Sequence, residues 1–120
     1  MIKFKNQIKL LTIEKNKTIG EAIEKINLNK MKTVFVIDNK SKKYIGSVTD
    51  GDLRRGMLKN LSTNNGVMSV VKKKSIFFKK KPSLRKLNEA FSKNFVQCIP
   101  YLDSKNKISE IFISTPTVLL

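Results

Sequence analysis

The strongest constraint on the fold is a pattern that occurs twice, 65 residues apart. This shift aligns four pairs of positions without a gap: Thr18 with Ser83, Ile19 with Leu84, Ile26 with Phe91, and Asp38 with Asp103. Each copy, of about 55 residues, is too small to bury a core of its own, so the two copies are expected to pack together. We therefore predict an α/β (α+β) fold of two βαββα-like repeats packed with pseudo-two-fold symmetry.

Each copy is expected to contain a helix that follows a capping residue. Thr18 with Glu21 three residues later is typical of a capping box, and Ser83 is the corresponding N-cap after Pro82. Apolar residues then recur at helical spacing. The residues expected to be buried are Ile19, Ala22, Ile23 and Ile26 in the first copy, Leu53 and Met57 in a second helix that starts at Thr49, and Leu84, Leu87 and Phe91 in the second copy.

Short β-branched and aromatic runs predict a pair of strands in each copy. They are Val34–Ile37 with Tyr44–Val48 in the first copy, and Cys98–Leu102 with Ile108–Ile113 in the second. The later strands align once one residue is removed from the loop. Because proline has no backbone N–H, Pro100 predicts that its strand lies at a sheet edge, with the position of the missing N–H facing away from the paired strand.

The duplication divides the chain into segments. Residues 1–60 form the first repeat with an N-terminal strand, 61–66 a linker, 67–115 the second repeat, and 116–120 the start of a following domain. The run Thr117–Leu120 is typical of a buried strand that begins a further domain. We therefore expect this chain to be a piece of a larger enzyme, cut where the catalytic domain begins.

Composition excludes several classes of site. The chain has no His and one Cys, so a zinc site of the His₂Cys₂ type, a His-activated nucleophile and an internal disulfide are all excluded. We predict no catalytic and no metal-binding residues. A lone Cys98 in an apolar stretch suits a reducing cytosol, and neither a signal peptide nor an apolar run of roughly 18 residues is present. The expected location is the cytoplasm.

The charge of the chain is strongly basic, with 25 Lys and Arg against 9 Asp and Glu, a net +16. Only three of the basic residues are Arg, the usual reader of base edges. Two lysine runs, 72–74 and 79–81, flank the apolar Ile76–Phe78. We interpret the lysines mainly as a solvated surface, which makes a nucleic-acid partner the unfavoured alternative.

The segment Gly46–Arg55 carries the chemistry of the chain. It places Thr49 at a strand end, Asp52 one turn into the next helix and Arg55 one turn further on. A carboxylate can accept hydrogen bonds from the two ribose hydroxyls, and an arginine can neutralise a phosphate. Thr49 with Asp52 is also a capping-box arrangement, with Gly51 relaxing the first turn. Spacing alone leaves both interpretations open.

The duplicated unit resembles a pair of cystathionine-β-synthase (CBS) domains, a Bateman module. The resemblance rests on T-I-x-E-A-I-x-x-I from Thr18, V-F-V-I-D from Val34 and G-x-x-T-x-G-D-L-R-R from Gly46, and it covers about residues 8–114. It implies binding of an adenosine or guanosine nucleotide such as AMP or GMP in a cleft between the repeats, no required cofactor, and a homodimer.

The resemblance also implies which residues bind the nucleotide. Ser47, Thr49 and Asp52 would hold the ribose, and Arg55, or a nearby lysine, the phosphate. The base wall would come from a strand start at Ser75 and Ile76 and from Val96, Gln97 and Cys98, although Val96 and Cys98 would serve equally as core residues. The second copy continues Ser114-Thr115-Pro116-Thr117 and lacks an acid at the position of Asp52. One competent site per chain is therefore expected.

The motif T-D-G-D-L-R-R, which begins at Thr49, resembles only a subset of the family. It resembles modules attached to sugar-phosphate enzymes, namely the N-terminal CBS pair of sugar-nucleotide nucleotidyltransferases and the C-terminal pair of arabinose-5-phosphate isomerases. The first implies a regulatory module of a sugar-1-phosphate nucleotidyltransferase, whose catalytic domain lies in the same parent chain. The alternatives are a module that only dimerises, without ligand, and a pair attached to an isomerase.

Overall fold

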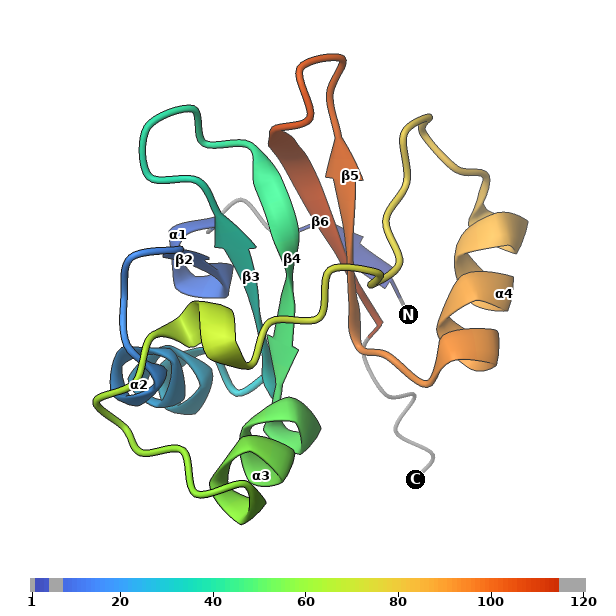
Figure 1. Ribbon diagram of the computed structural model, residues 1–120. Helices are drawn as coiled ribbons and strands as arrows, with labels where there is room; N and C mark the ends of the chain where they lie inside the picture. Colours follow the sequence, from blue (N-terminus) through green and yellow to red (C-terminus); the bar gives the residue numbers. More distant parts are fainter. Residues whose placement is uncertain (1, 5–7, 115–120) are drawn as a thin grey trace. The chain divides into compact units, whose positions relative to one another are not determined.

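The computed structural model describes residues 2–4 and 8–114, which divide into two units (Figure 1). Among the described residues, the first unit comprises 9–75, and the second comprises 76–114 with 2–4 and Ile8. The boundary follows Ser75, later than the expected linker 61–66, and the N-terminal residues group with the second unit. The ranges 1–60, 61–66 and 67–115 stay a prediction about the duplicated sequence, and 116–120 lie outside the described residues.

The first unit contains a three-stranded sheet in the order β2-β3-β4. After α1 (Ile8–Leu11), β2 (Thr12–Glu14) runs parallel to β3 (Thr33–Ile37), and β3 pairs antiparallel with β4 (Tyr44–Thr49). The helix α2 (Ile19–Asn29) crosses from β2 to β3, and α3 (Asp50–Leu58) begins where β4 ends. The 3₁₀ helix η1 (Val67–Ser69) follows.

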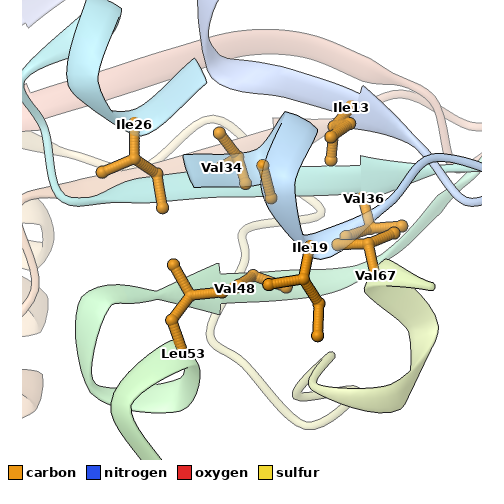
Figure 2. Packing of buried hydrophobic residues seen from close by; sticks show 9 residues of the cluster. Ile13, Ile19, Ile26, Val34, Val36, Val48, Leu53 and Val67 are labelled. Atoms are coloured by element: carbon orange, nitrogen blue, oxygen red, sulfur yellow. The ribbon is translucent and has the colours of Figure 1, made fainter. Parts of the chain in front are cut away.

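The core of the first unit joins the sheet to both helices (Figure 2). Its buried residues are Ile13, Ile19, Ala22, Ile26, Val34, Val36, Val48, Leu53 and Val67. The predicted capping box is present, because the Thr18 side chain accepts from the Glu21 N–H while the Glu21 carboxylate accepts from the Thr18 N–H. Ile23 is only partly buried at the edge of this core.

The prediction that Met57 is buried in α3 is wrong, because its side chain is exposed. The buried residue on this turn is Gly56, one position earlier. A Cβ atom at Gly56 would lie 2.7 Å from Val70 Cγ1 and 3.3 Å from Leu61 Cδ1. The returning chain therefore packs directly on the glycine backbone, and Met57 is left at the rim.

The second unit contains a sheet in the order β1-β6-β5. Strand β6 (Ile108–Ser114) lies between β5 (Cys98–Leu102) and β1 (Ile2–Phe4), and both pairings are antiparallel. The helix α4 (Leu84–Asn94) begins after its N-cap Ser83, as predicted. The buried core of the second unit consists of Leu87, Phe91, Ile99 and Phe112.

The prediction that Leu84 is buried is wrong, because 67% of the residue is exposed. Its counterpart Ile19 is fully buried, and the Ile19 N–H donates to the carbonyl of Asn65 in the segment that follows α3. Helical periodicity places Leu84 on the correct face but does not supply the chain that covers that face.

Pro100 explains why the expected strand start at Ser75 and Ile76 is absent. The second edge of β5 makes one isolated parallel bridge, in which the Phe78 N–H donates to the Pro100 carbonyl and the Leu102 N–H donates to the Phe78 carbonyl. To extend this ladder, residue 100 would have to donate to the carbonyl of Ile76, and proline has no N–H. The missing donor faces away from β6, as predicted, and β5 remains an edge strand on that side.

The duplication is visible in the backbone itself. Both helices end in a left-handed residue, Lys30 after α2 and Phe95 after α4, 65 residues apart. The register shifts in the two hairpins, at Val36/Ile37 and Tyr101/Leu102, are also 65 residues apart. The parallel pairs Ile13↔Val36 and Phe78↔Tyr101 repeat the same offset. The predicted internal repeat is therefore confirmed as a repeat of backbone geometry.

Candidate functional site

The junction between β4 and α3 holds the residues that the sequence singles out. Thr49 is the N-cap of α3, and Asp52 occupies the third helical position. The Asp52 Oδ2 atom accepts from the Thr49 N–H at 2.9 Å and from Thr49 Oγ1 at 3.0 Å, and the Asp52 N–H donates to Thr49 Oγ1 at 3.2 Å. The capping interpretation is therefore realised, and it engages one of the two Asp52 oxygens.

The other oxygen of Asp52 is engaged by an arginine. Arg55 Nη2 donates to Asp52 Oδ1 at 2.6 Å, which closes an ion pair across one turn of α3. The guanidinium lies over Gly51, where a Cβ atom would be 3.3 Å from Arg55 Nη1. The three residues thus form a compact polar cluster at the start of the helix.

A second capping box in the same unit gives a standard of comparison. Thr18 and Glu21 form the capping box of α2 with the same pattern of hydrogen bonds, but 48% of the Glu21 side chain is exposed. Only 9% of the Asp52 side chain is exposed. Burial of a carboxylate beyond what a cap requires is costly unless it is paired, and the Arg55 guanidinium supplies that pairing.

Ser47 lies two residues before Thr49 and is buried. Its backbone pairs with Lys72, the Ser47 N–H donating at 3.0 Å and its carbonyl accepting at 2.8 Å. At Gly46 a Cβ atom would lie 2.4 Å from the Lys72 carbonyl oxygen. The chain that leaves η1 therefore runs directly against β4 beside the cluster.

Ser75 is held by a residue that sequence reasoning missed. The Tyr44 hydroxyl and Ser75 Oγ lie 2.5 Å apart, and the Tyr44 ring packs against Phe35 at a centroid distance of 6.1 Å. Burial raises the pKa of the Tyr44 phenol, so it remains a neutral hydrogen-bonding group at physiological pH. No local pattern marks this pair, because the two residues are 31 positions apart.

The remaining predicted site residues belong to the second unit. Ile76 and Val96 pack against its core, which is consistent with the core interpretation of Val96. Cys98 is buried, and burial raises the pKa of its thiol to about 12, so the sulfur is a neutral apolar group. Gln97 is exposed, and its carbonyl accepts from the Ser114 N–H at 2.9 Å. The first unit thus holds Ser47, Thr49, Asp52, Arg55 and Ser75, and the second holds Ile76, Val96, Gln97 and Cys98.

The comparisons with known proteins bear on this arrangement. The family model of the CBS domain matches residues 6–59. A CBS domain pair/ACT domain protein from Thermotoga maritima has a similar structure, with a TM-score of 0.68, 16% identity and coverage of 83% of this chain and 78% of that one. The chain has the fold of a CBS domain pair.

Two further structures are similar to this chain. A CBS domain protein from Streptococcus pneumoniae has a TM-score of 0.73 and 12% identity over 92% of this chain and 77% of that one. The cytosolic domain of the Mg²⁺ channel MgtE, in complex with ATP, has a TM-score of 0.68 and 12% identity over 86% and 41%. At these identities the likeness concerns the fold. Comparison with curated proteins finds no match.

Neither a metal site nor a membrane span is found among the described residues, 2–4 and 8–114. Those residues contain no group of three or more Cys, Asp or Glu side chains arranged to hold a metal ion. Within the same ranges, no helix is long and apolar enough to cross a membrane.

Proposed function

We propose that this CBS pair is a regulatory module that binds an adenosine or guanosine nucleotide at the β4–α3 junction. The observation that carries the proposal is the Asp52 side chain, of which 9% is exposed: its Oδ1 atom is contacted by an exposed arginine while Oδ2 is engaged by the helix cap. A structure of similar fold, the cytosolic domain of MgtE, is in complex with ATP, which supports a nucleotide as the ligand class.

The proposed roles follow from the chemistry of each group. Asp52 accepts hydrogen bonds from the ribose hydroxyls, Thr49 adds a further hydrogen bond through its hydroxyl, with Ser47 beside them, and Arg55 neutralises a phosphate. The base is received by the predicted wall of Ser75, Ile76, Val96, Gln97 and Cys98. Binding regulates only if the nucleotide has different affinities for two arrangements of the protein, since that difference sets the shift in population.

The larger setting is also part of the proposal. The T-D-G-D-L-R-R wording supports a parent sugar-1-phosphate nucleotidyltransferase, in which this module regulates a catalytic domain of the same chain. The module acts in the cytoplasm as a homodimer, requires no cofactor, and has no turnover of its own. An isomerase parent and a ligand-free dimerisation module are the alternatives.

Calorimetric titration of AMP and GMP into the wild-type protein, the Asp52→Ala variant and the Glu21→Ala variant tests the site. Both substitutions remove the partner of a capping box and are expected to lower the free energy of unfolding by about 1 kcal/mol. Only Asp52→Ala removes a proposed ribose ligand. We therefore expect micromolar-range binding to the wild type and to Glu21→Ala, and a loss of at least about tenfold in Asp52→Ala.

The matched pair separates a ligand role from a structural one. Equal nucleotide affinity in all three proteins would show that Asp52 only caps α3. A dimer that binds neither AMP nor GMP would favour the structural alternative. Thermal unfolding of each variant confirms that the comparison is made between folded proteins.

A further inference from the structure

We propose that Arg55 is a latch that occupies Asp52 in the empty site and transfers to the phosphate when a nucleotide binds. The inference rests on the proposed nucleotide site and adds its specificity: the latch makes the site select nucleotides over nucleosides. Arg55 is thereby a competitor of ribose as well as a ligand of phosphate.

The two carboxylate oxygens of Asp52 have different hydrogen-bond partners. Oδ2 accepts both bonds of the helix cap, from the Thr49 N–H and Thr49 Oγ1. Oδ1 accepts from Arg55 Nη2 at 2.6 Å. A ligand can therefore approach Oδ1 without undoing the start of α3, and in the proposed mechanism it displaces Arg55 from that oxygen.

The two side chains of the ion pair differ in how firmly they are held in place. Asp52 is buried and fixed by the cap, whereas 66% of the Arg55 side chain is exposed. The guanidinium rests over Gly51, which offers no side chain to hold it. The long arginine side chain can therefore change partners while the carboxylate keeps its position.

The thermodynamic consequence differs between two ligands that share a ribose and a base. A nucleoside that takes Oδ1 breaks the Arg55–Asp52 pair and gives the guanidinium no new anion. A nucleotide breaks the same pair but provides a phosphate, which forms a charge-assisted and often bidentate contact with arginine. Removal of Arg55 should therefore change the affinities for the two ligands in opposite directions.

The experiment compares the wild type, Arg55→Gln and the control Arg54→Gln. Arg54 is the neighbouring arginine on α3 and is exposed, and it forms no ion pair with any residue in the described ranges. Calorimetry measures the affinity for whichever of AMP or GMP binds and for its nucleoside, at low and high salt. In Arg55→Gln we expect the nucleoside to bind about threefold to fivefold more tightly and the nucleotide about tenfold more weakly.

Salt gives a second readout that a purely structural role would not move. Screening weakens the exposed ion pair, so the wild type should bind the nucleoside more tightly as salt rises. This gain should vanish in Arg55→Gln, while Arg54→Gln should behave as the wild type in every titration.

The outcomes distinguish the latch from the site on which it rests. If AMP or GMP binds and Asp52→Ala abolishes binding, but Arg55→Gln leaves nucleoside affinity unchanged or lowers it, the site stands and the latch is refuted. If neither the wild type nor Arg55→Gln binds any of these ligands, the proposed function fails and the latch fails with it.

Discussion

At the scale of single residues, Gly46 shows how close backbone contact constrains one position. It lies inside β4, where a glycine ordinarily weakens a strand. A Cβ atom there would lie 2.4 Å from the Lys72 carbonyl oxygen and 3.1 Å from Lys73 Cα. Both contacts are with backbone, which cannot move aside as a flexible side chain can.

Gly46→Ala should therefore destabilise the first unit by about 1–3 kcal/mol, the range typical of overpacking. Gly66→Ala is the matched control, because a Cβ atom at Gly66 would meet nothing within 4 Å and its φ is −68°. That variant should be neutral or slightly stabilising. Urea denaturation measures both, and equal stability of the two variants would contradict the close approach of Lys72 to β4.

At the scale of elements, the two hairpin turns use an aspartate in the same way. Asp38 Oδ2 accepts from the backbone N–H groups of Lys40 and Ser41, and Asp38 Oδ1 pairs with Lys15 at 2.8 Å. Asp103 Oδ1 accepts from the N–H groups of Lys105 and Lys107. These are the aligned acids of the two copies, so the duplication preserves the chemistry of the turn.

Both turns should make stability depend on pH in the acid range. The Lys15 side chain and then the turn N–H groups hold the pKa of Asp38 well below its usual range, and the Lys107 N–H chiefly lowers the pKa of Asp103. A lowered folded-state pKa stabilises the fold above the unfolded-state pKa of about 4 and loses that contribution as pH falls further. Asp38→Asn and Asp103→Asn should each lower stability at neutral pH and flatten its decline below about pH 4.

Thermal unfolding between neutral and strongly acidic pH measures this effect. Glu89→Gln on α4 is a suitable control, because the pair between Glu89 and Arg85 is well exposed and adds little to stability. An unchanged acid slope in both aspartate variants would show that other carboxylates account for the decline.

At the scale of the whole molecule, the chain closes its second sheet with its first residues. Strand β1 pairs with β6 in the register Ile2↔Ser114, Lys3↔Ile113 and Phe4↔Phe112 (Figure 1). In the first unit the corresponding edge, that of β4, is met by Lys72, which pairs with Ser47. The last strand of each hairpin thus has a further neighbour on its outer edge. In the second unit this neighbour is the N-terminal strand β1, and in the first unit it is Lys72, in the segment that follows η1.

Deleting residues 1–7 should therefore loosen the second unit and leave the first unit intact. We expect the amides of β6 that face β1 to lose hydrogen-exchange protection, while those between β3 and β4 keep it. The two hairpins in one sample act as each other's control. Protection that falls equally in both hairpins, or in neither, would contradict this assignment of β1.

Local patterns in the sequence account for much of the fold and for part of the site. The capping residues Thr18, Thr49 and Ser83 and the hairpin strands depend on neighbours within a few positions, and the structure confirms them. The 65-residue repeat is found by comparing these local patterns along the chain, and it is also confirmed. The strand expected at Ser75–Ile76 fails for a reason visible only in three dimensions, since it would need a donor that Pro100 lacks.

What the sequence by itself determined is the duplicated order of elements and the placement of Thr49, Asp52 and Arg55 at successive turns of one helix start, because caps and helical spacing are short-range. Only the tertiary structure decided that β1 completes the second sheet and that Tyr44 holds Ser75. Both contacts join residues far apart in the chain, so they are selected by packing in the folded state and no local pattern encodes them. The pair between Arg55 and Asp52 joins residues three positions apart on α3, a spacing that the sequence already shows, and the structure adds which oxygen of Asp52 the arginine contacts.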